Sequence, residues 1–393
     1  MISLSKLLLE TETESFGDRL RYGRDAGATR HGTHGDHGPV VVWNCTRACN
    51  LSCKHCYCSA TGAPEPNELS TSEAEAFIDD LASYRVPVLL LSGGEPTLRA
   101  DLPQLIRRAR NHGIRCTIST NGTLISRRRA AEYRRLGVSY IGISLDGIGR
   151  RNDRFRGRRG AFEDALAGIR NCKAEGQKMG LRFTMSRDNL QDLDEIFELV
   201  EREDIPRICF YHLVYAGRGA EMTADAPTHA ETRAALDRII EWCRRTAEKG
   251  HSREVLTVDN HCDGVYLYRK LRESRPERAE RVLELLRRSG GNRSGVAIGQ
   301  VDWLGNVHAD QFTPNHSFGN VRETPFSRIW SEAAHPVLAG LRDRRALLGG
   351  RCAECAYLDV CNGNLRARAE AVHGDFWAPD PACYLDYETE LQV

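Results

Sequence analysis

Residues 43–61 read WNCTRACNLSCKHCYCSAT, and they continue a short β-branched run at Val40–Trp43. Within this stretch Cys49, Cys53 and Cys56 are spaced as C-x3-C-x2-C. Three thiolates from one loop can hold three irons of a 4Fe-4S cluster and leave the fourth iron open to another ligand. Zinc is the alternative, but structural zinc sites prefer paired C-x2-C elements and four ligands. The spacing therefore favours an iron–sulfur cluster directly after the first strand.

A regular alternation extends outward from this loop. Apolar or β-branched runs are each followed by a helix-like segment of about 12 to 20 residues. The runs are Val40–Trp43, Val86–Leu91, Arg115–Ser119, Tyr140–Leu145, Leu181–Met185 and Ile208–Val214. Six strand–helix units predict a parallel sheet, and they are too few to close an eight-stranded barrel. We therefore expect an α/β fold, a partial (β/α)6 barrel, with functional groups at the C-terminal ends of its strands.

Composition narrows the class of protein. The chain has 393 residues, with 55 Lys and Arg against 54 Asp and Glu. This near-neutral charge argues against a dedicated nucleic-acid partner. We find no secretory leader and no apolar run of the roughly 18 to 20 residues that a membrane span needs. We therefore expect a cytoplasmic protein without membrane partners, in which most of the 14 cysteines are metal ligands or reduced thiols rather than disulfides.

The chain divides by pattern into four parts. We expect a Gly- and His-rich N-terminal lead-in over 1–39, the partial barrel over 40–225, a helical and hairpin extension over 226–350, and a cysteine-rich segment over 351–393. In the extension we expect helices over Thr228–Lys249 and Gly264–Arg288, and a hairpin over residues 296–312.

A second cysteine group lies in the last segment. Cys352, Cys355, Cys361 and Cys383 are spaced as C-x2-C-x5-C-x21-C. Closely grouped cysteines of this kind predict a metal site in a reducing compartment, with a zinc ribbon as one alternative. Four protein ligands would saturate an iron–sulfur cluster, which favours electron transfer or a structural role.

The other cysteines fall outside both spacings. Cys45 and Cys58 flank the triplet, and their role stays open. The remaining five lie in apolar strand-like or helix-like contexts, where small buried hydrophobes are the expected reading: Cys116, Cys172, Cys209, Cys243 and Cys262.

Motifs at the ends of the next strands add a resemblance. The second strand ends in SGGEP, the third in STNGT and the fourth in SLDG. Together with the cysteine triplet and the aromatic residue after it, these motifs resemble the radical S-adenosylmethionine (SAM) superfamily. Each motif alone is a common turn. Their conjunction is specific.

The resemblance implies a cofactor and its contacts. It implies SAM bound at the open iron of a reduced 4Fe-4S cluster, which cleaves SAM to a 5′-deoxyadenosyl radical. It also implies a low-potential electron donor such as ferredoxin or flavodoxin. The methionine amino group would meet Gly93, Gly94 and Glu95, and the adenine would lie near Tyr57. The carboxylate or ribose would meet Ser119, Asn121, Ser144 and Asp146.

The second cysteine group resembles the end of the SPASM extension, which carries auxiliary 4Fe-4S clusters. In DWLGNVHADQF, where a cysteine is usual in that extension, this chain has His308, Asp310 and Gln311. We therefore expect one auxiliary 4Fe-4S cluster rather than two, held by Cys352, Cys355, Cys361 and Cys383.

Longer stretches resemble the tetrapyrrole-modifying radical SAM enzymes, above all the 12,18-didecarboxysiroheme deacetylases of siroheme-dependent haem biosynthesis. They include GISLDGIGRRNDRFRG, FYHLVYAGRG and TVDNHCDG. The implied reaction removes two acetate side chains and gives iron-coproporphyrin III. A flat ring with several carboxylates should bind between aromatic walls, with cationic side chains around the carboxylates. Substrate candidates after the sixth strand and in the extension are Tyr211, His212, Tyr215, Arg218, His308 and Gln311.

Three alternatives remain. A haem d1 synthesis enzyme would remove propionates from the same class of ring. A SPASM peptide-modifying maturase would need an N-terminal peptide-recognition domain, for which residues 1–39 are too few and too Gly-rich. A non-catalytic zinc or scaffold protein is opposed by the open-site triplet combined with the GGEP motif.

Overall fold

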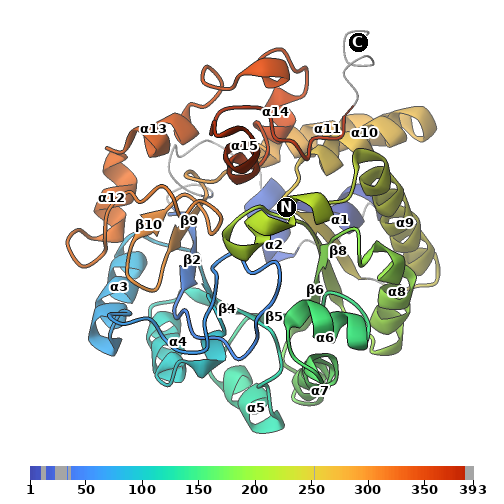
Figure 1. Cartoon of the computed structure of the whole chain (residues 1–393). Helices are drawn as coiled ribbons and strands as arrows, with labels where there is room; N and C mark the ends of the chain where they lie inside the picture. Colours follow the sequence, from blue (N-terminus) through green and yellow to red (C-terminus); the bar gives the residue numbers. More distant parts are fainter. Residues whose placement is uncertain (10–14, 23–32, 34–36, 252, 386–393) are drawn as a thin grey trace.

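The computed structural model describes residues 1–9, 15–22, 33, 37–251 and 253–385. A ten-stranded sheet in the order β1-β8-β7-β6-β5-β4-β3-β2-β9-β10 forms its centre (Figure 1). From β9 through β2 to β8 every neighbouring pair is parallel, whereas β1 and β10 pair antiparallel at the two edges. The strands are β1 (Ile2–Ser3), β2 (Val40–Asn44), β3 (Val88–Ser92), β4 (Arg115–Thr120), β5 (Tyr140–Ser144), β6 (Met179–Met185), β7 (Arg207–His212), β8 (Glu254–Val258), β9 (Ile298–Val301) and β10 (Val307–His308).

The six predicted strands correspond to β2–β7, in sequential order and in parallel register, as a partial (β/α)6 barrel requires. The predicted hairpin is present as β9 and β10, but β9 also pairs in parallel with β2. Sequence analysis missed β8, a run of five residues between helices, which continues the parallel sheet beyond β7. The parallel sheet is therefore wider than six strands at both sides and does not close.

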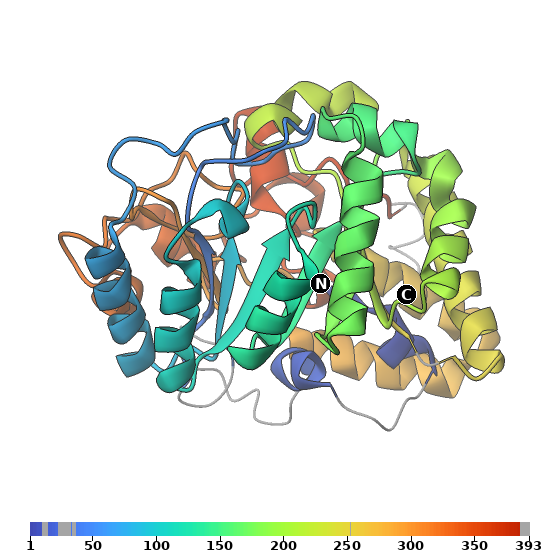
Figure 2. The same cartoon turned by 90° about the horizontal axis from the view of Figure 1, so that it is seen from below.

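Helices surround the convex side of this sheet (Figures 1 and 2). The α-helices are α1 (Leu4–Leu9), α2 (Phe16–Tyr22), α3 (Thr71–Ser83), α4 (Leu102–Asn111), α5 (Arg127–Arg135), α6 (Arg150–Arg156), α7 (Ala161–Ala174), α8 (Leu193–Arg202), α9 (His229–Glu248), α10 (Cys262–Ser274), α11 (Pro276–Ser289), α12 (Phe326–Glu332), α13 (Pro336–Arg342), α14 (Leu358–Cys361) and α15 (Arg366–His373). Four 3-10 segments are η1 (Pro96–Leu98), η2 (Leu190–Asp192), η3 (Gly217–Asp225) and η4 (Gly350–Cys352).

Local sequence explains where these helices begin and end. A capping box formed by Ser70 and Glu73 starts α3. The single helix predicted over Gly264–Arg288 is two helices, because Arg275 is extended (φ −149°) and Pro276 opens α11 at its first position. Proline lacks the N–H that would continue the preceding helix.

The sheet separates the hydrophobic core under the helices from the pocket inside the barrel. In β3, Leu89 and Leu91 belong to the hydrophobic core under the helices, whereas Leu90 and Ser92 face a pocket inside the barrel. β6 alternates in the same way, with Phe183 in the core and its neighbours facing inward. This two-residue period is the usual property of a strand. Inward positions of the strands therefore build the candidate site.

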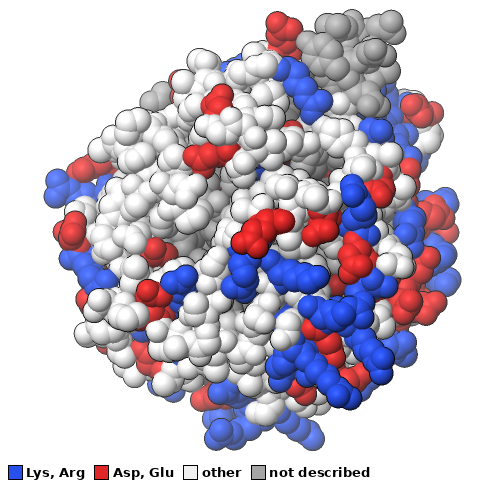
Figure 3. Space-filling model, in the orientation of Figure 1, with Lys and Arg blue, Asp and Glu red and all other residues white. Residues whose placement is uncertain are grey.

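The first residues take part in the core. Ile2, Leu4 and Leu7 are at most 1% exposed, and β1 pairs with β8. Parts of the predicted lead-in 1–39 lie outside the described residues. No described helix is long and apolar enough to cross a membrane. Basic and acidic side chains are interspersed on the face shown in Figure 3, and they are densest over α6 and α7.

Candidate functional site

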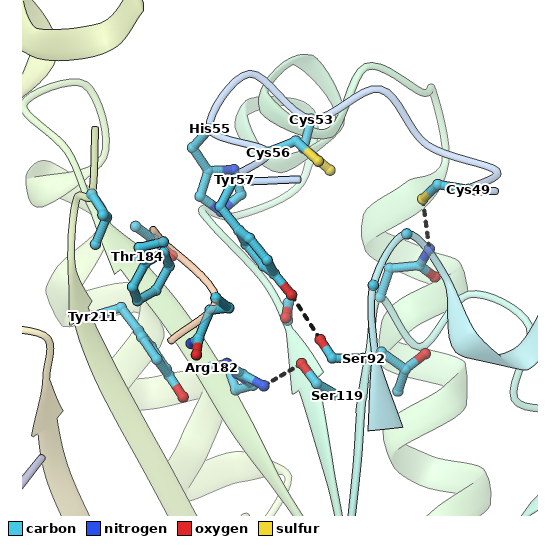
Figure 4. Close-up of a pocket in the computed structure, with 18 of the residues that line it drawn as sticks. Cys49, Cys53, His55, Cys56, Tyr57, Ser92, Ser119, Arg182, Thr184 and Tyr211 are labelled. Carbon is cyan, nitrogen blue, oxygen red and sulfur yellow. Dashed lines mark hydrogen bonds between the residues drawn. The ribbon is translucent and has the colours of Figure 1, made fainter. Parts of the chain in front are cut away.

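A pocket opens at the C-terminal ends of the parallel strands, as predicted for a partial barrel (Figure 4). It holds about 1020 Å³ of empty space, counting the part that is open to solvent. Apolar residues form much of its wall: Val42, Leu51, Leu90, Leu213, Val214 and Phe312.

The cysteine loop forms the roof of this pocket. Cys49, Cys53 and Cys56 all line it, and none of them is in a disulfide. The N–H groups of Gly94 and Glu95 donate to the carbonyls of Thr46 (2.8 Å) and Ala48 (2.7 Å). On the other side, the N–H groups of Ser52 and Lys54 donate to the carbonyls of Arg156 (3.1 Å) and Phe155 (3.0 Å). The loop is thus held between the end of β3 and the end of α6.

Gly93 and Gly94 are required for this arrangement. Gly93 has φ +121°, and a Cβ added there would meet the Thr46 carbonyl oxygen at 2.4 Å. A Cβ on Gly94 would meet the Ala48 carbonyl oxygen at 2.2 Å. Both residues also line the pocket. The glycines therefore let the backbone of the cysteine loop approach the end of β3, in addition to any contact with a ligand.

A buried ion pair lies beside the thiols. Arg156 pairs with Asp146, and its Nη1 lies 3.6 Å from the sulfur of Cys53. His55 Nε2 is 3.4 Å from Asp146 Oδ2. Burial, above all, lowers the pKa of His55 to about 4, so this imidazole is neutral at pH 7. Of the two basic residues that contact Asp146, Arg156 is therefore the one that carries a positive charge.

The three thiols differ in their surroundings. Burial raises the pKa of Cys49 to about 12 and also raises that of Cys53. The pKa of Cys56 is lowered to about 6, chiefly by its hydrogen bond with Cys58, whose sulfur is 3.7 Å away. Because metal ligation requires thiolates, iron would have to displace protons from Cys49 and Cys53 on binding.

Four of the predicted SAM contacts besides the two glycines line the pocket: Tyr57, Ser119, Asn121 and Ser144. Glu95 and Asp146 do not. Glu95 is fully buried and accepts hydrogen bonds from Thr97, Thr120 and the Asn121 N–H. It ties the ends of β3 and β4 together. Protein donors therefore surround the Glu95 carboxylate, and its contact with the methionine amino group stays a prediction.

The predicted substrate residues divide in the same way. Tyr211, His212, Arg218 and Gln311 line the pocket, whereas Tyr215 and His308 do not. His308 is only 3% exposed on β10, and its Nδ1 lies 2.9 Å from the carbonyl oxygen of His316. Arg218 uses two guanidinium nitrogens to donate to the carbonyls of Cys53 (3.0 Å) and Ala60 (2.9 Å). It braces the cysteine loop.

Sequence analysis missed three charged residues of the pocket, Arg156, Arg182 and Asp259. Arg182 is at an inward position of β6, where it bonds to the Ser119 hydroxyl and lies 4.7 Å from the centre of the Tyr211 ring. No salt bridge of the described residues involves it, although buried cations are usually paired. The strand alternation in MGLRFTM was the signal that could have identified it.

The pocket wall also carries polar groups that the protein does not satisfy. Buried nitrogens of His55, Arg156 and Arg218 and the amide oxygen of Gln311 have no hydrogen-bond partner among the described residues. Buried polar groups are normally paired, so a polar ligand is expected to complete them. The donor set, three cysteines in one loop with unpaired donors beside them, fits a 4Fe-4S cluster with SAM beneath it.

The second cysteine group surrounds a separate, smaller pocket. Cys352, Cys355, Cys361 and Cys383 all line it. A fifth thiol, Cys262, lines it as well, although its sequence context indicated only apolar packing. Cys262 and Cys383 hydrogen-bond to each other. No three His, Cys, Asp or Glu side chains of the described residues lie close enough to hold a single metal ion.

Comparison with known proteins identifies the family of this chain. The Radical SAM superfamily model matches residues 43–200. The Fe-coproporphyrin III synthase of Methanosarcina barkeri is 55% identical over 396 residues, which cover 99% of this chain and 98% of that one. The chain belongs to the radical SAM superfamily. It is therefore a radical SAM enzyme, with SAM and a 4Fe-4S cluster as cofactors.

One further relative and one solved structure are also similar to this chain. The Pre-heme d1 synthase of Dinoroseobacter shibae is 44% identical over 351 residues, covering 88% of this radical SAM enzyme and 86% of that protein. Among solved structures, Streptococcus suis SuiB bound to S-adenosylmethionine matches with a TM-score of 0.69. At 17% identity, over 89% of this chain and 78% of SuiB, that match supports the fold alone.

Proposed function

We propose that this radical SAM enzyme is a 12,18-didecarboxysiroheme deacetylase, which removes two acetate side chains and yields iron-coproporphyrin III. The observation that carries the proposal is the 55% identity over 99% of the chain with an Fe-coproporphyrin III synthase, against 44% over 88% for a Pre-heme d1 synthase. The haem d1 type of reaction, removal of propionates, is the second candidate because of that 44% relative.

The residues of the pocket would divide the work as follows. Cys49, Cys53 and Cys56 would hold the catalytic 4Fe-4S cluster. SAM bound to that cluster supplies, on one-electron reduction, the radical that abstracts hydrogen from the substrate. The protein orients the reactants and excludes water. Arg182, with Ser119 beside it, is suited to a carboxylate of SAM or of the substrate because it forms no salt bridge within the described part of the chain.

A tetrapyrrole fits the rest of the pocket by chemistry. The flat apolar ring would contact the apolar wall around Leu213, Val214 and Phe312. Its carboxylates would need donors, and Tyr211 and His212 lie on that wall. We further propose that the second cysteine group holds one auxiliary 4Fe-4S cluster, with Cys352, Cys355, Cys361 and Cys383 as ligands. A low-potential donor such as ferredoxin or flavodoxin would supply the electrons.

The decisive experiment is anaerobic. The reconstituted enzyme is given SAM, a low-potential reductant and 12,18-didecarboxysiroheme, and the products are identified by mass. The proposal expects iron-coproporphyrin III, with loss of two acetate groups from each tetrapyrrole molecule. Loss of propionates would support the haem d1 type of reaction instead. SAM cleavage without any change to the ring would contradict both.

A matched pair of variants controls this experiment. Cys53→Ala should abolish SAM cleavage, because two thiolates cannot hold the cluster with its open iron. Cys172→Ala should cleave SAM normally, since Cys172 lies on α7 with its side chain buried in the hydrophobic core. Normal cleavage by Cys53→Ala would show that the cysteine triplet has been assigned wrongly.

A further inference from the structure

One short turn connects the two pockets. It follows β8, and it contributes Asp259 to the barrel pocket and Cys262 to the second pocket. Between them, Asn260 fixes the turn: its amide donates to the Ala382 carbonyl (2.9 Å), and its side-chain oxygen accepts from Asn364 (2.7 Å). The two sites are therefore joined by three peptide bonds.

Side chains make a second connection. His212 lines the barrel pocket, and its Nε2 is 2.8 Å from Asp263 Oδ2. The other oxygen of Asp263 accepts a hydrogen bond from the Tyr384 hydroxyl at 2.7 Å. Asp263 directly follows Cys262, and Tyr384 directly follows Cys383. A chain of three buried residues thus runs from the wall of the barrel pocket to the cysteines of the second pocket.

The buried connection through His212, Asp263 and Tyr384 contains one ion pair, between Asp263 and His212. Asp263 is completely buried. Burial by itself would raise the pKa of this carboxyl, but the neighbouring His212, above all, lowers it below its usual value. His212 is its only salt-bridge partner among the described residues. A buried carboxylate needs a compensating positive charge. The ring of His212 can supply that charge by carrying a proton on both nitrogens, because Nε2 is held by Asp263 and Nδ1 remains for a ligand in the pocket.

We propose that His212 is the proton donor to the departing acetate, and that Asp263 and Tyr384 are positioning residues that hold its ring. This rests on the proposed deacetylase function. Hydrogen abstraction leaves an unpaired electron on the ring carbon next to the acetate-bearing carbon. Cleavage of the bond to the acetate then forms a ring double bond and releases a •CH2CO2⁻ fragment. One electron from the low-potential reductant and the proton on Nδ1 of His212 convert that fragment to acetate.

The test separates hydrogen abstraction from quenching. In His212→Gln, product is measured per 5′-deoxyadenosine formed, because this ratio separates the proton transfer from any effect of the variant on substrate binding or on hydrogen abstraction. Iron-coproporphyrin III formed per 5′-deoxyadenosine should fall by roughly a hundredfold, the scale of a lost general acid. Asp263→Asn should lower the same ratio, and Asp263→Glu should restore part of it. His112→Gln, at an exposed helix end, is the matched control.

Tyr384→Phe keeps the bond between His212 and Asp263 and loses only one donor to the carboxylate. We expect a smaller drop in the product ratio, with KM for the tetrapyrrole unchanged and the iron and sulfide content of the wild type. A product ratio in His212→Gln within twofold of the wild type would overturn the inference. If the wild type itself makes no iron-coproporphyrin III, the proposed function fails first, and the two results are distinguishable.

Discussion

Arg156 Nη1 lies 3.6 Å from the sulfur of Cys53, and the same guanidinium forms a buried ion pair with Asp146. A fixed positive charge is thus placed next to one of the three thiols that would hold the catalytic cluster. Reduction adds negative charge to a cluster, and its potential depends on net charge and on hydrogen bonds to its sulfurs. The ion pair should therefore favour the reduced state.

Replacing Arg156 tests this. Arg156→Gln should make the reduction potential of the catalytic cluster more negative, whereas Arg156→Lys, which keeps the charge, should shift it less. Losing one partner of a buried pair also costs about 3–5 kcal/mol of stability. The double variant Arg156→Gln with Asp146→Asn should recover part of that stability and part of the potential, because it removes a negative charge together with the positive one. A redox titration followed by EPR, with thermal unfolding beside it, measures both. An unchanged potential in Arg156→Gln would contradict the assignment.

Gly94 offers a test of how the cysteine loop is held. Gly94→Ala would place a Cβ 2.2 Å from the Ala48 carbonyl oxygen, so the loop must move away from β3. We expect the variant to retain less than about a tenth of the wild-type SAM cleavage, on the scale of the effects that small misplacements have on catalysis. Gly62→Ala is the control, because a Cβ there meets no atom within 4 Å. Equal iron content and activity in the two variants would show that the close approach is not needed.

The five thiols of the second pocket can be distinguished by iron analysis. Cys383→Ser should lose about four of the eight irons that two 4Fe-4S clusters contain. Cys262→Ser should keep them but change the EPR signal of the auxiliary cluster, because Cys262 hydrogen-bonds to Cys383. Cys243→Ser, buried in the hydrophobic core, should change neither. Loss of iron from the Cys262 variant would show that it is a ligand and that the expected set of four is wrong.

The raised pKa of the Asp259 carboxyl predicts that the stability of the fold depends on pH. Burial, as the largest cause, raises the pKa of this carboxyl to about 6 in the folded protein, against about 3.9 in an unfolded chain. The folded state therefore binds this proton more tightly, and its contribution is fully present below about pH 4 and is lost as the pH rises through about 6. Asp259→Asn should flatten the stability curve between about pH 4 and 6 relative to the wild type. Urea unfolding at several pH values measures this, and parallel curves for the two proteins would contradict it.

The sequence predicted the fold well because its signals are local. The six strands from Val40 to His212 are apolar runs followed by amphipathic helices, and both periods can be read without tertiary information. The strand β8 escaped because its five residues lie between long helices. The order of the sheet then follows from the right-handed, sequential connections that parallel strands require.

The site was predictable only where a residue's position along a strand determines its direction. Ser119 and Ser144 lie in the last two positions of β4 and β5, and both line the pocket. Glu95 and Asp146 stand in equally suggestive motifs but bind other parts of the protein. A carboxylate in a turn can serve a ligand or the scaffold, and the sequence does not distinguish the two. The meeting of His212, Asp263 and Tyr384 joins three distant segments, so no local pattern could indicate it.

The turn that follows β8 has a consequence for how this enzyme can change during evolution. Because Asp259 and Cys262 belong to different pockets but to the same turn, an insertion or deletion there displaces both at once. Substitutions that adapt the barrel pocket to a new substrate will be tolerated or rejected according to what stands at the second pocket. We expect the two sites to be inherited as one unit, with strong epistasis between them.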